Sequence, residues 1–236
     1  MYKQFALGLL LLFFIGLPRS GQAQLEIFLE FLIYDYGLFF GFEDEPGAFD
    51  IDFAKFPYEQ DYHGLYLPVE DAGFRIRTKV NFHLLNGSDA IDGGYLQVKF
   101  SPISTISLDM NRLHLYEDLG LGENQLYSFT NISFQYNRVR NHRIHFWWDL
   151  GVTKAAHGYD EWGGSAGLGT TIYIKKPISL YAAARWTYFR EELDTVSNYD
   201  LRLQMHLKQF LIYGGMQRIG GDVDWTRWII GTGIYF

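Results

Sequence analysis

The sequence predicts an all-β fold: a single antiparallel transmembrane β-barrel of about twelve strands, with ten strands as the alternative. Three observations lead to this prediction. Long segments alternate apolar and polar residues, as strands with one lipid-facing side do. Short and long connections alternate between those segments. The chain also begins with a short apolar run and ends on an aromatic residue, Phe236.

The first 23 residues have the features of a secretory signal peptide. Lys3 precedes an apolar run of 13 residues, from 5 to 17, and Gly21-Gln22-Ala23 supplies a small-x-small cleavage site. That run is shorter than the ~20 residues of a spanning helix. We therefore expect cleavage after Ala23 and one barrel domain over residues 24–236; an uncleaved N-terminal anchor is the alternative.

Composition and charge exclude several classes of protein. Removing Lys3 and Arg19 with the leader leaves 18 basic and 27 acidic residues, a formal charge of −9, whereas nucleic-acid binding needs a basic surface. The chain has no cysteine, which excludes disulfides and a lipoprotein anchor. Aromatic residues make up 18% of the chain, yet no run of 18 apolar residues follows the leader. Alternating membrane strands have this composition, because only every second residue meets lipid.

The strongest alternation runs from Gly73 to Leu85. Such a stretch is longer than the ~5–6 residues of a typical soluble strand and matches the ~9–11 of a tilted membrane strand. One face carries Phe74, Ile76, Thr78, Val80, Phe82 and Leu84, and the other carries Arg75, Arg77, Lys79, Asn81 and His83.

Counting back from Phe236, similar segments give the expected twelve strands. The first two are the least regular, so ten strands with an N-terminal plug is the alternative. The expected strands are 26–41, 47–56, 73–85, 93–101, 103–115, 125–138, 142–154, 162–175, 178–190, 198–208, 210–218 and 225–236.

The connections indicate two different rims. Tight turns are expected at Ser101-Pro102, Arg140-Asn141-His142, Lys176-Pro177 and Lys208-Gln209, and longer polar loops between them. In outer-membrane barrels the short turns face the periplasm. The long loops are acidic, which is typical of a solvated rim; divalent cations bridging to lipopolysaccharide are the alternative. The expected partners are accordingly outer-membrane lipid and lipopolysaccharide.

The C-terminal strand resembles the signal by which the barrel-insertion machinery recognises its clients. Trp228, Ile230, Thr232, Ile234 and Phe236 share one face, and the chain ends on that aromatic. Together with Lys175-Lys176-Pro177, the Ser101-Pro102 turn and the ending Gly231-Thr232-Gly233-Ile234-Tyr235-Phe236, this resembles uncharacterised outer-membrane β-barrel proteins of Bacteroidota. The resemblance implies a fold, a location and the insertion machinery as a transient partner, and no activity.

A lumen charge stripe is the candidate binding feature. Arg75, Arg77 and Lys79 alternate with apolar residues, and Asp50 and Asp52 do so in the segment expected to pair with them. A hairpin would bring these charges together inside the barrel. The first interpretation is a salt-bridged filling of the lumen, since unpaired buried charge is costly. The second is a basic wall that guides an anionic solute.

The sequence predicts no catalytic, cofactor or metal site. None of the seven histidines is followed two residues later by Ser, as a phospholipase-type barrel would need, and Asn131, Ser133 and His145 only share a face on adjacent strands. His142 and His145 would point to opposite faces of a strand, which argues against a metal site. The leading hypothesis is a narrow channel or a structural or assembly component of the envelope. A membrane-embedded lipid hydrolase is second, a soluble periplasmic β-protein is third, and the oligomeric state stays open.

Overall fold

The computed structural model describes residues 51–59, 64–68, 76–86, 91–118, 124–140, 143–156, 160–190, 195–221 and 225–236. The predicted leader, the predicted strand at 26–41, Asp50 and Arg75 lie outside these residues. Within the described part of the chain, no helix is long and apolar enough to cross a membrane.

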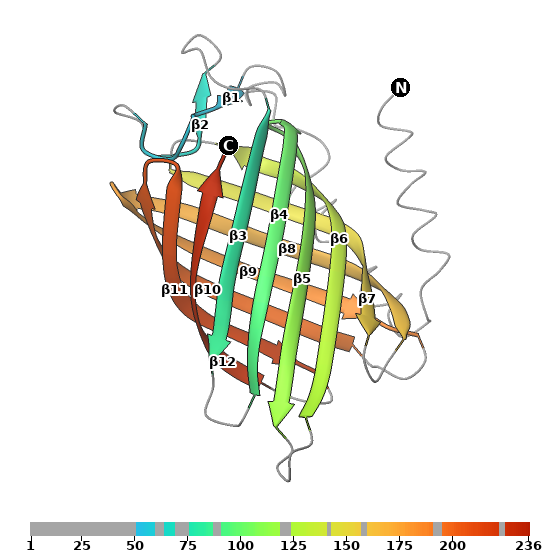
Figure 1. Ribbon diagram of the computed structural model, residues 1–236. Helices are drawn as coiled ribbons and strands as arrows, with labels where there is room; N and C mark the ends of the chain where they lie inside the picture. The colour runs from blue at the N-terminus through green and yellow to red at the C-terminus, as the bar shows by residue number, and fades with distance from the viewer. Residues whose placement is uncertain are drawn as a thin grey trace, which may run out of the picture. The chain divides into compact units, whose positions relative to one another are not determined.

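Ten antiparallel strands close into a barrel (Figure 1). Consecutive strands pair from β3 to β12, and β12 pairs with β3 to complete the ring, with Ile234 opposite Val80. The strands are β3 (Arg77–Asn86), β4 (Ile91–Ile103), β5 (Ile106–Asp118), β6 (Asn124–Arg140), β7 (Ile144–Ala156), β8 (Glu161–Lys175), β9 (Ile178–Tyr188), β10 (Thr195–Leu207), β11 (Phe210–Gly220) and β12 (Trp225–Tyr235).

Alternation along each strand separates a polar inside from an apolar outside. On β3, Asn81 and His83 are buried in the barrel, whereas Phe82 and Leu84 are exposed on its outer face. Successive side chains of a strand point to opposite faces, so the alternating sequence dictates this division. The buried polar side chains of the other strands follow the same two-residue period, apart from Ser128 and Arg138 on β6.

The two ends of the barrel differ in their connections. Short turns lie at one end, at Ser104-Thr105 between β4 and β5, Lys176-Pro177 between β8 and β9, and Lys208-Gln209 between β10 and β11. We call this the turn end and the opposite end the loop end. The turn expected at Ser101-Pro102 is wrong: both residues belong to β4, where the pairing with β5 shifts between Phe100 and Ile103. Proline has no N–H to donate and is tolerated at such an irregularity.

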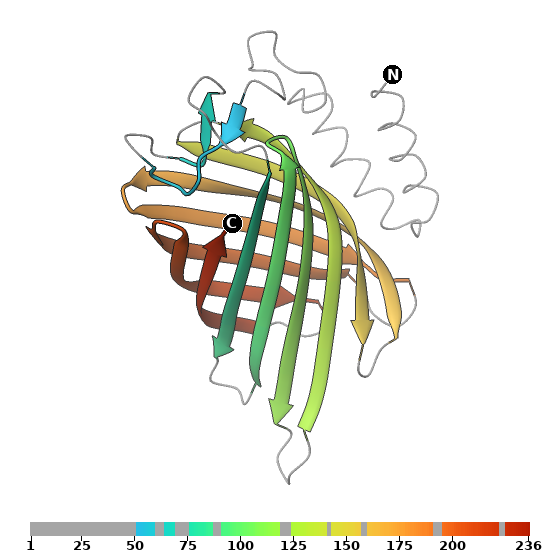
Figure 2. The ribbon, with the colours of Figure 1, turned by 45° about the horizontal axis from the view of Figure 1, so that its top comes forward.

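The prediction of a barrel strand at 47–56 is also wrong. Residues 51–53 form β1 (Ile51–Phe53), which pairs with β2 (Tyr66–Pro68) in a separate two-stranded sheet. Phe53 and Ala54 are consecutive and both buried, so this segment does not alternate between a lumen and an outer face. The barrel therefore has the ten strands of the alternative prediction. We call residues 51–59 and 64–68 the turn-end cap; β1 and β2 are seen beside the turn end in Figures 1 and 2.

Candidate functional site

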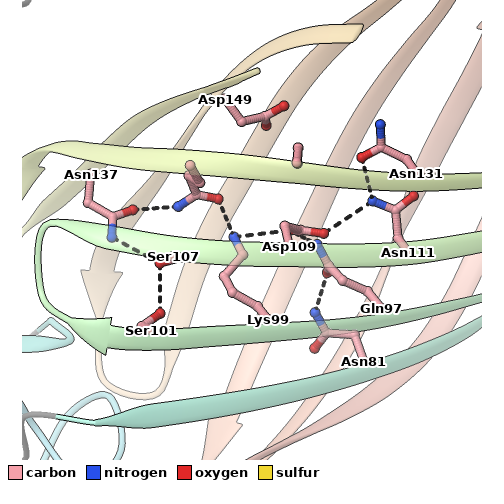
Figure 3. A network of polar contacts seen from close by, with 12 residues as sticks. Asn81, Gln97, Lys99, Ser101, Ser107, Asp109, Asn111, Asn131, Asn137 and Asp149 are labelled. Carbon is pink, nitrogen blue, oxygen red and sulfur yellow. Dashed lines mark hydrogen bonds and ion pairs between the residues drawn. The ribbon is translucent and has the colours of Figure 1, made fainter. Parts of the chain in front are cut away.

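A network of polar side chains crosses the middle of the lumen (Figure 3). Asn81 Nδ2 donates to Gln97 Oε1 at 2.7 Å, and Gln97 Nε2 donates to Asp109 Oδ2 at 2.5 Å. Lys99 Nζ lies 3.5 Å from Asp109 Oδ2 and donates to Gln135 Oε1 at 2.7 Å. These residues come from β3, β4, β5 and β6, so one continuous chain of contacts ties four strands together from the inside.

The network extends in both directions along the lumen. Towards the loop end, Asn131 Nδ2 donates to Thr153 Oγ1 at 2.8 Å and to Ser165 Oγ at 2.7 Å, which adds β7 and β8. Towards the turn end, Asn137 Nδ2 donates to Ser107 Oγ at 3.1 Å, and Asn137 Oδ1 lies 3.0 Å from His145 Nε2. Polar groups buried in a barrel need such partners, because an unmade hydrogen bond is costly there.

Two ion pairs occupy the opposite wall. Arg185 Nη2 on β9 lies 3.0 Å from Asp149 Oδ2 on β7, and the Asp149 side chain has no exposed surface. Arg202 pairs with Asp200 on its own strand, β10. The Arg202 guanidinium also lies 4.8 Å from the ring centroid of Tyr213 and 5.8 Å from that of Tyr95 on β4, across the lumen. Cation–aromatic contacts of this kind are attractive and fill space at the same time.

Apolar side chains close the loop end of the lumen. Leu85, Tyr95, Leu113, Leu115, Ile219 and Ile229 form a buried cluster, with Tyr127, Phe129, Val196 and Trp225 packed against it. Tyr127 on β6 and Trp225 on β12 lie with their ring centroids 5.8 Å apart. These two strands do not pair with each other, so this contact spans the lumen. The inside of the barrel is thus polar at mid-height and apolar at the loop end.

The turn-end cap closes the other end with aromatic side chains. Phe53, Tyr58, Leu65 and Tyr66 of the cap form a buried cluster with Tyr173 of β8. The Tyr58 hydroxyl donates to the carbonyl of Ile178. Burial raises the pKa of Tyr58 from its ordinary 10 to about 12. The cap is therefore docked by both apolar packing and hydrogen bonds.

Arg77 of β3 ties the cap to the barrel wall. Arg77 Nη1 donates to the carbonyl of Ala54 in the cap at 2.9 Å. Its guanidinium lies 5.7 Å from the ring centroid of Phe53 and 4.2 Å from that of Tyr235 on β12.

Three small cavities lie along the described lumen. One of about 40 Å³ lies near the loop end beside Asn131 and Arg185, one of about 30 Å³ lies at mid-height beside Trp147, and one of about 30 Å³ lies under the cap beside Lys79. A single water needs ~10–15 Å³ by this kind of measure, so each cavity holds a few waters. Side chains fill most of the lumen.

The members of the predicted charge stripe fall in different places. Arg77 is buried in the lumen, and Lys79 lines the cavity under the cap. Asp50 and Arg75 lie outside the described residues, as does the side chain of Asp52. The backbone of Asp52 pairs with Leu67 of β2 and not with β3, so the expected hairpin that would face the aspartates to the stripe does not form.

The residues of the predicted C-terminal signal lie on the outer face of β12. Trp228, Ile230 and Phe236 are exposed there, and Ile234 is partly covered. The backbone of Phe236 exchanges two hydrogen bonds with Thr78, of 2.9 and 3.1 Å, so the last residue also helps to close the barrel. Its recognition during insertion stays a prediction.

The structure does not assemble the serine–histidine arrangement considered from the sequence. Ser133 lies opposite Gly151, whereas His145 lies opposite Arg140 near the turn end. A different pair meets instead: Ser179 Oγ lies 2.8 Å from His206 Nε2. His206 Nδ1 has no hydrogen-bond partner among the described residues, so no described carboxylate orients this histidine as a catalytic base requires.

The sequence interpretation missed the centre of the polar network. Lys99 and Asp109 lie on strands that were predicted, and period-two alternation from Phe100 and Leu108 would have turned both inward. Their pairing follows from β4–β5 register, in which Lys99 lies opposite Asp109. A turn at Ser101-Pro102 does not place Lys99 opposite Asp109.

Comparison with known proteins adds a likeness in shape only. The sequence matches no protein-family model and no curated protein. Among solved structures, the chain is similar to the N-terminal β-barrel domain of Pseudomonas aeruginosa OprF, with 11% identity and a TM-score of 0.33 over 68% of this chain and 96% of that one. A likeness at this identity and score says nothing about function.

Proposed function

We propose that this chain is an integral barrel of the bacterial outer membrane that serves as a sealed, non-enzymatic structural component of the envelope. The observation that carries the proposal is the division of the barrel wall into an apolar outside and a filled, polar inside. Each half of this proposal rests on its own set of contacts.

The outer face supports the membrane location. Trp228 and Ile230 are 69% and 68% exposed on β12, and similar side chains follow around the ring. They include Ile76, Phe82, Leu84, Leu96, Leu108, Phe134, Val152, Ile174, Leu201, Leu203 and Ile212. Soluble proteins rarely expose contiguous apolar patches beyond a few hundred Å². An apolar band that encircles a closed barrel matches a lipid bilayer as its surroundings.

The two closures of the lumen support the structural role. The contact between Tyr127 and Trp225 narrows the loop end with apolar rings, and the cap covers the turn end. Apolar constrictions exclude water and ions from narrow pores. A barrel closed in this way contributes stability and surface to the membrane and passes no solute in this conformation.

A narrow, anion-preferring channel is the second candidate. Cationic side chains outnumber carboxylates on the described lumen wall, which would favour anions if the closures opened. The cations are Arg77, Lys79, Lys99, Arg185, Arg202 and Arg227, and the carboxylates are Asp109, Asp149, Asp200 and Glu161.

The lipid hydrolase is not favoured by the described residues. Ser179 and His206 are both buried inside the barrel, beneath the aromatic side chains of the cap, where an acyl chain in the membrane does not reach. A hydrolase of membrane lipids needs its nucleophile on the lipid-facing side or at its edge.

Fluorescence quenching by brominated lipid tests the membrane location. The full chain is folded into phosphatidylcholine vesicles with brominated acyl chains, and tryptophan emission is compared with that in unbrominated vesicles. Trp228 lies on the outer face and should be quenched; W228F should therefore lose part of the quenching, whereas W147F, which removes a lumen-facing ring, should not. Equal quenching in both variants, or none in the parent, would contradict the proposal.

A further inference from the structure

A cavity of about 30 Å³ lies inside the barrel directly beneath the turn-end cap. Its lining includes three cationic side chains, Arg77, Lys79 and Lys99, together with Tyr66 of the cap and His145 of β7. No aspartate or glutamate is among the described residues that line it. The concentration of positive charge around one small cavity is the feature that needs a physical explanation.

Lys79 is the cation of this lining that has no hydrogen bond or ion pair with a described residue. Its ammonium group lies 5.2 Å from the ring centroid of Tyr235. A lysine ammonium has three donors, and leaving them unused away from bulk water is costly. Something other than the described side chains must therefore meet this charge.

The neighbouring cations and Tyr66 add positive charge and hydrogen-bond donors to the cavity. Lys99 is partly neutralised by Asp109 at 3.5 Å, but Asp109 also accepts from Gln97 and Asn111. Two nitrogens of the Arg77 guanidinium, Nε and Nη2, are buried without a hydrogen-bond partner among the described residues, and so is the hydroxyl of Tyr66. Arg77 lies between aromatic rings and contributes positive charge to the cavity, whereas Lys79 and Tyr66 can contribute donors.

We propose that this cavity is a binding site for one small inorganic anion, of which chloride is the physiological example. A volume of about 30 Å³, enough for a few waters, admits a single halide ion. The anion bridges Lys79 and Lys99 beneath Tyr66 and neutralises part of the charge that the wall of β3 and β4 places there. It thereby stabilises the docked cap. The site requires neither conduction nor a particular role in the envelope, so its failure and that of the structural role are separate results.

Anion dependence of unfolding tests the site in solution. Urea unfolding of the refolded full chain is followed at constant ionic strength while gluconate, which is too large for the cavity, is replaced by chloride. Above the dissociation constant, each tenfold increase in chloride should raise the folded-to-unfolded ratio about tenfold. K79M should remove this dependence, and the matched change K175M, at an exposed lysine, should retain it.

Bromide scattering tests the site without any substitution, which guards against a K79M chain that fails to fold. Crystals of the unaltered protein soaked in sodium bromide should show an anomalous peak beneath the cap, between Lys79 and Lys99. Unfolding that is indifferent to chloride, or bromide-soaked crystals with only water in the cavity, would overturn the proposal. A chloride dependence that persists in K79M would overturn it as well, because the anion would then bind elsewhere.

Discussion

Tyr127 on β6 and Trp225 on β12 lie with their ring centroids 5.8 Å apart, although β3, β4 and β5 separate their strands around the barrel wall. This contact narrows the lumen at the loop end. Thr153 lies deeper, beside the cavity of about 40 Å³. Access from the loop end to Thr153 should therefore depend on the two rings.

Thiol labelling measures that access, because the chain has no cysteine of its own. In T153C we expect little reaction with a membrane-impermeant thiol reagent. Adding Y127A and W225A should accelerate the reaction at least tenfold. T226C, at an exposed position of β12, should react quickly in both backgrounds. Equal rates for T153C and T226C in the parent would show that the loop end is open.

The buried pair of Arg185 and Asp149 should be costly to break from one side. R185M leaves the fully buried carboxylate of Asp149 without its cation, 3.0 Å away in the parent. We expect a loss of about 3–5 kcal/mol in the free energy of unfolding. Adding D149L should recover most of that loss, because the uncompensated charge is then removed too. A double-mutant cycle by urea unfolding checks this, and purely additive effects would contradict the pairing.

Gly231 on β12 should tolerate no side chain. A Cβ at this position would lie 2.5 Å from both the Cβ of His83 and the carbonyl oxygen of Phe82. G231A should therefore cost about 1–3 kcal/mol through overpacking. Gly94 on β4 is the matched control, since a Cβ there meets nothing within 4 Å. Similar unfolding midpoints for G231A and G94A would mean that the β12–β3 contact is looser than the structure shows.

Val80 tests which side of β3 faces lipid. It lies on the outer face, opposite Val98 and Ile234. V80R should destabilise the folded barrel in vesicles by ~2–4 kcal/mol if the residue is near the bilayer midplane. T226R, close to the loop end of β12, should cost much less. Folded fractions can be read from the shift in gel mobility between heated and unheated samples. A neutral V80R would place this face away from lipid.

Docking of the cap should weaken at alkaline pH. The pKa of Tyr58 is about 12 in the docked cap because of burial, and about 10 when the cap is released. The neutral phenol is thus the form that docks, so docking is unaffected below pH 10 and weakens as the pH rises towards 12. A dye on K55C, at an exposed cap position, reports the release. Y58F should lack this part of the transition; an identical profile in Y58F would rule out Tyr58 as its source.

The sequence patterns predict the strands of the barrel wall, but not the contacts between the side chains that fill the lumen. The predicted strand at 162–175 is observed as Glu161–Lys175, and that at 178–190 as Ile178–Tyr188, because each repeats a period of two over many residues. Residues 47–56 carry no sustained alternation, and Phe53 of this segment packs in the buried cluster of the cap.

Cross-lumen contacts depend on closure of the whole ring. The Arg202 guanidinium on β10 lies 5.8 Å from the ring centroid of Tyr95 on β4. No sequence pattern in either strand predicts this contact. The predicted hairpin between 47–56 and 73–85 is wrong for a related reason: it assumed that consecutive segments pair with each other. Residues 51–53 pair instead with β2 of the cap.

Single-channel recording tests the central claim most directly. The refolded full chain is added to a planar bilayer, and insertion is established in parallel by protease protection in vesicles of the same lipid. A lumen sealed at both ends predicts an inserted protein with no discrete current steps, and none when Y127A and W225A are combined, because the cap still covers the turn end. Steady, ion-selective steps from the unaltered protein would contradict the sealed barrel and establish the channel in its place.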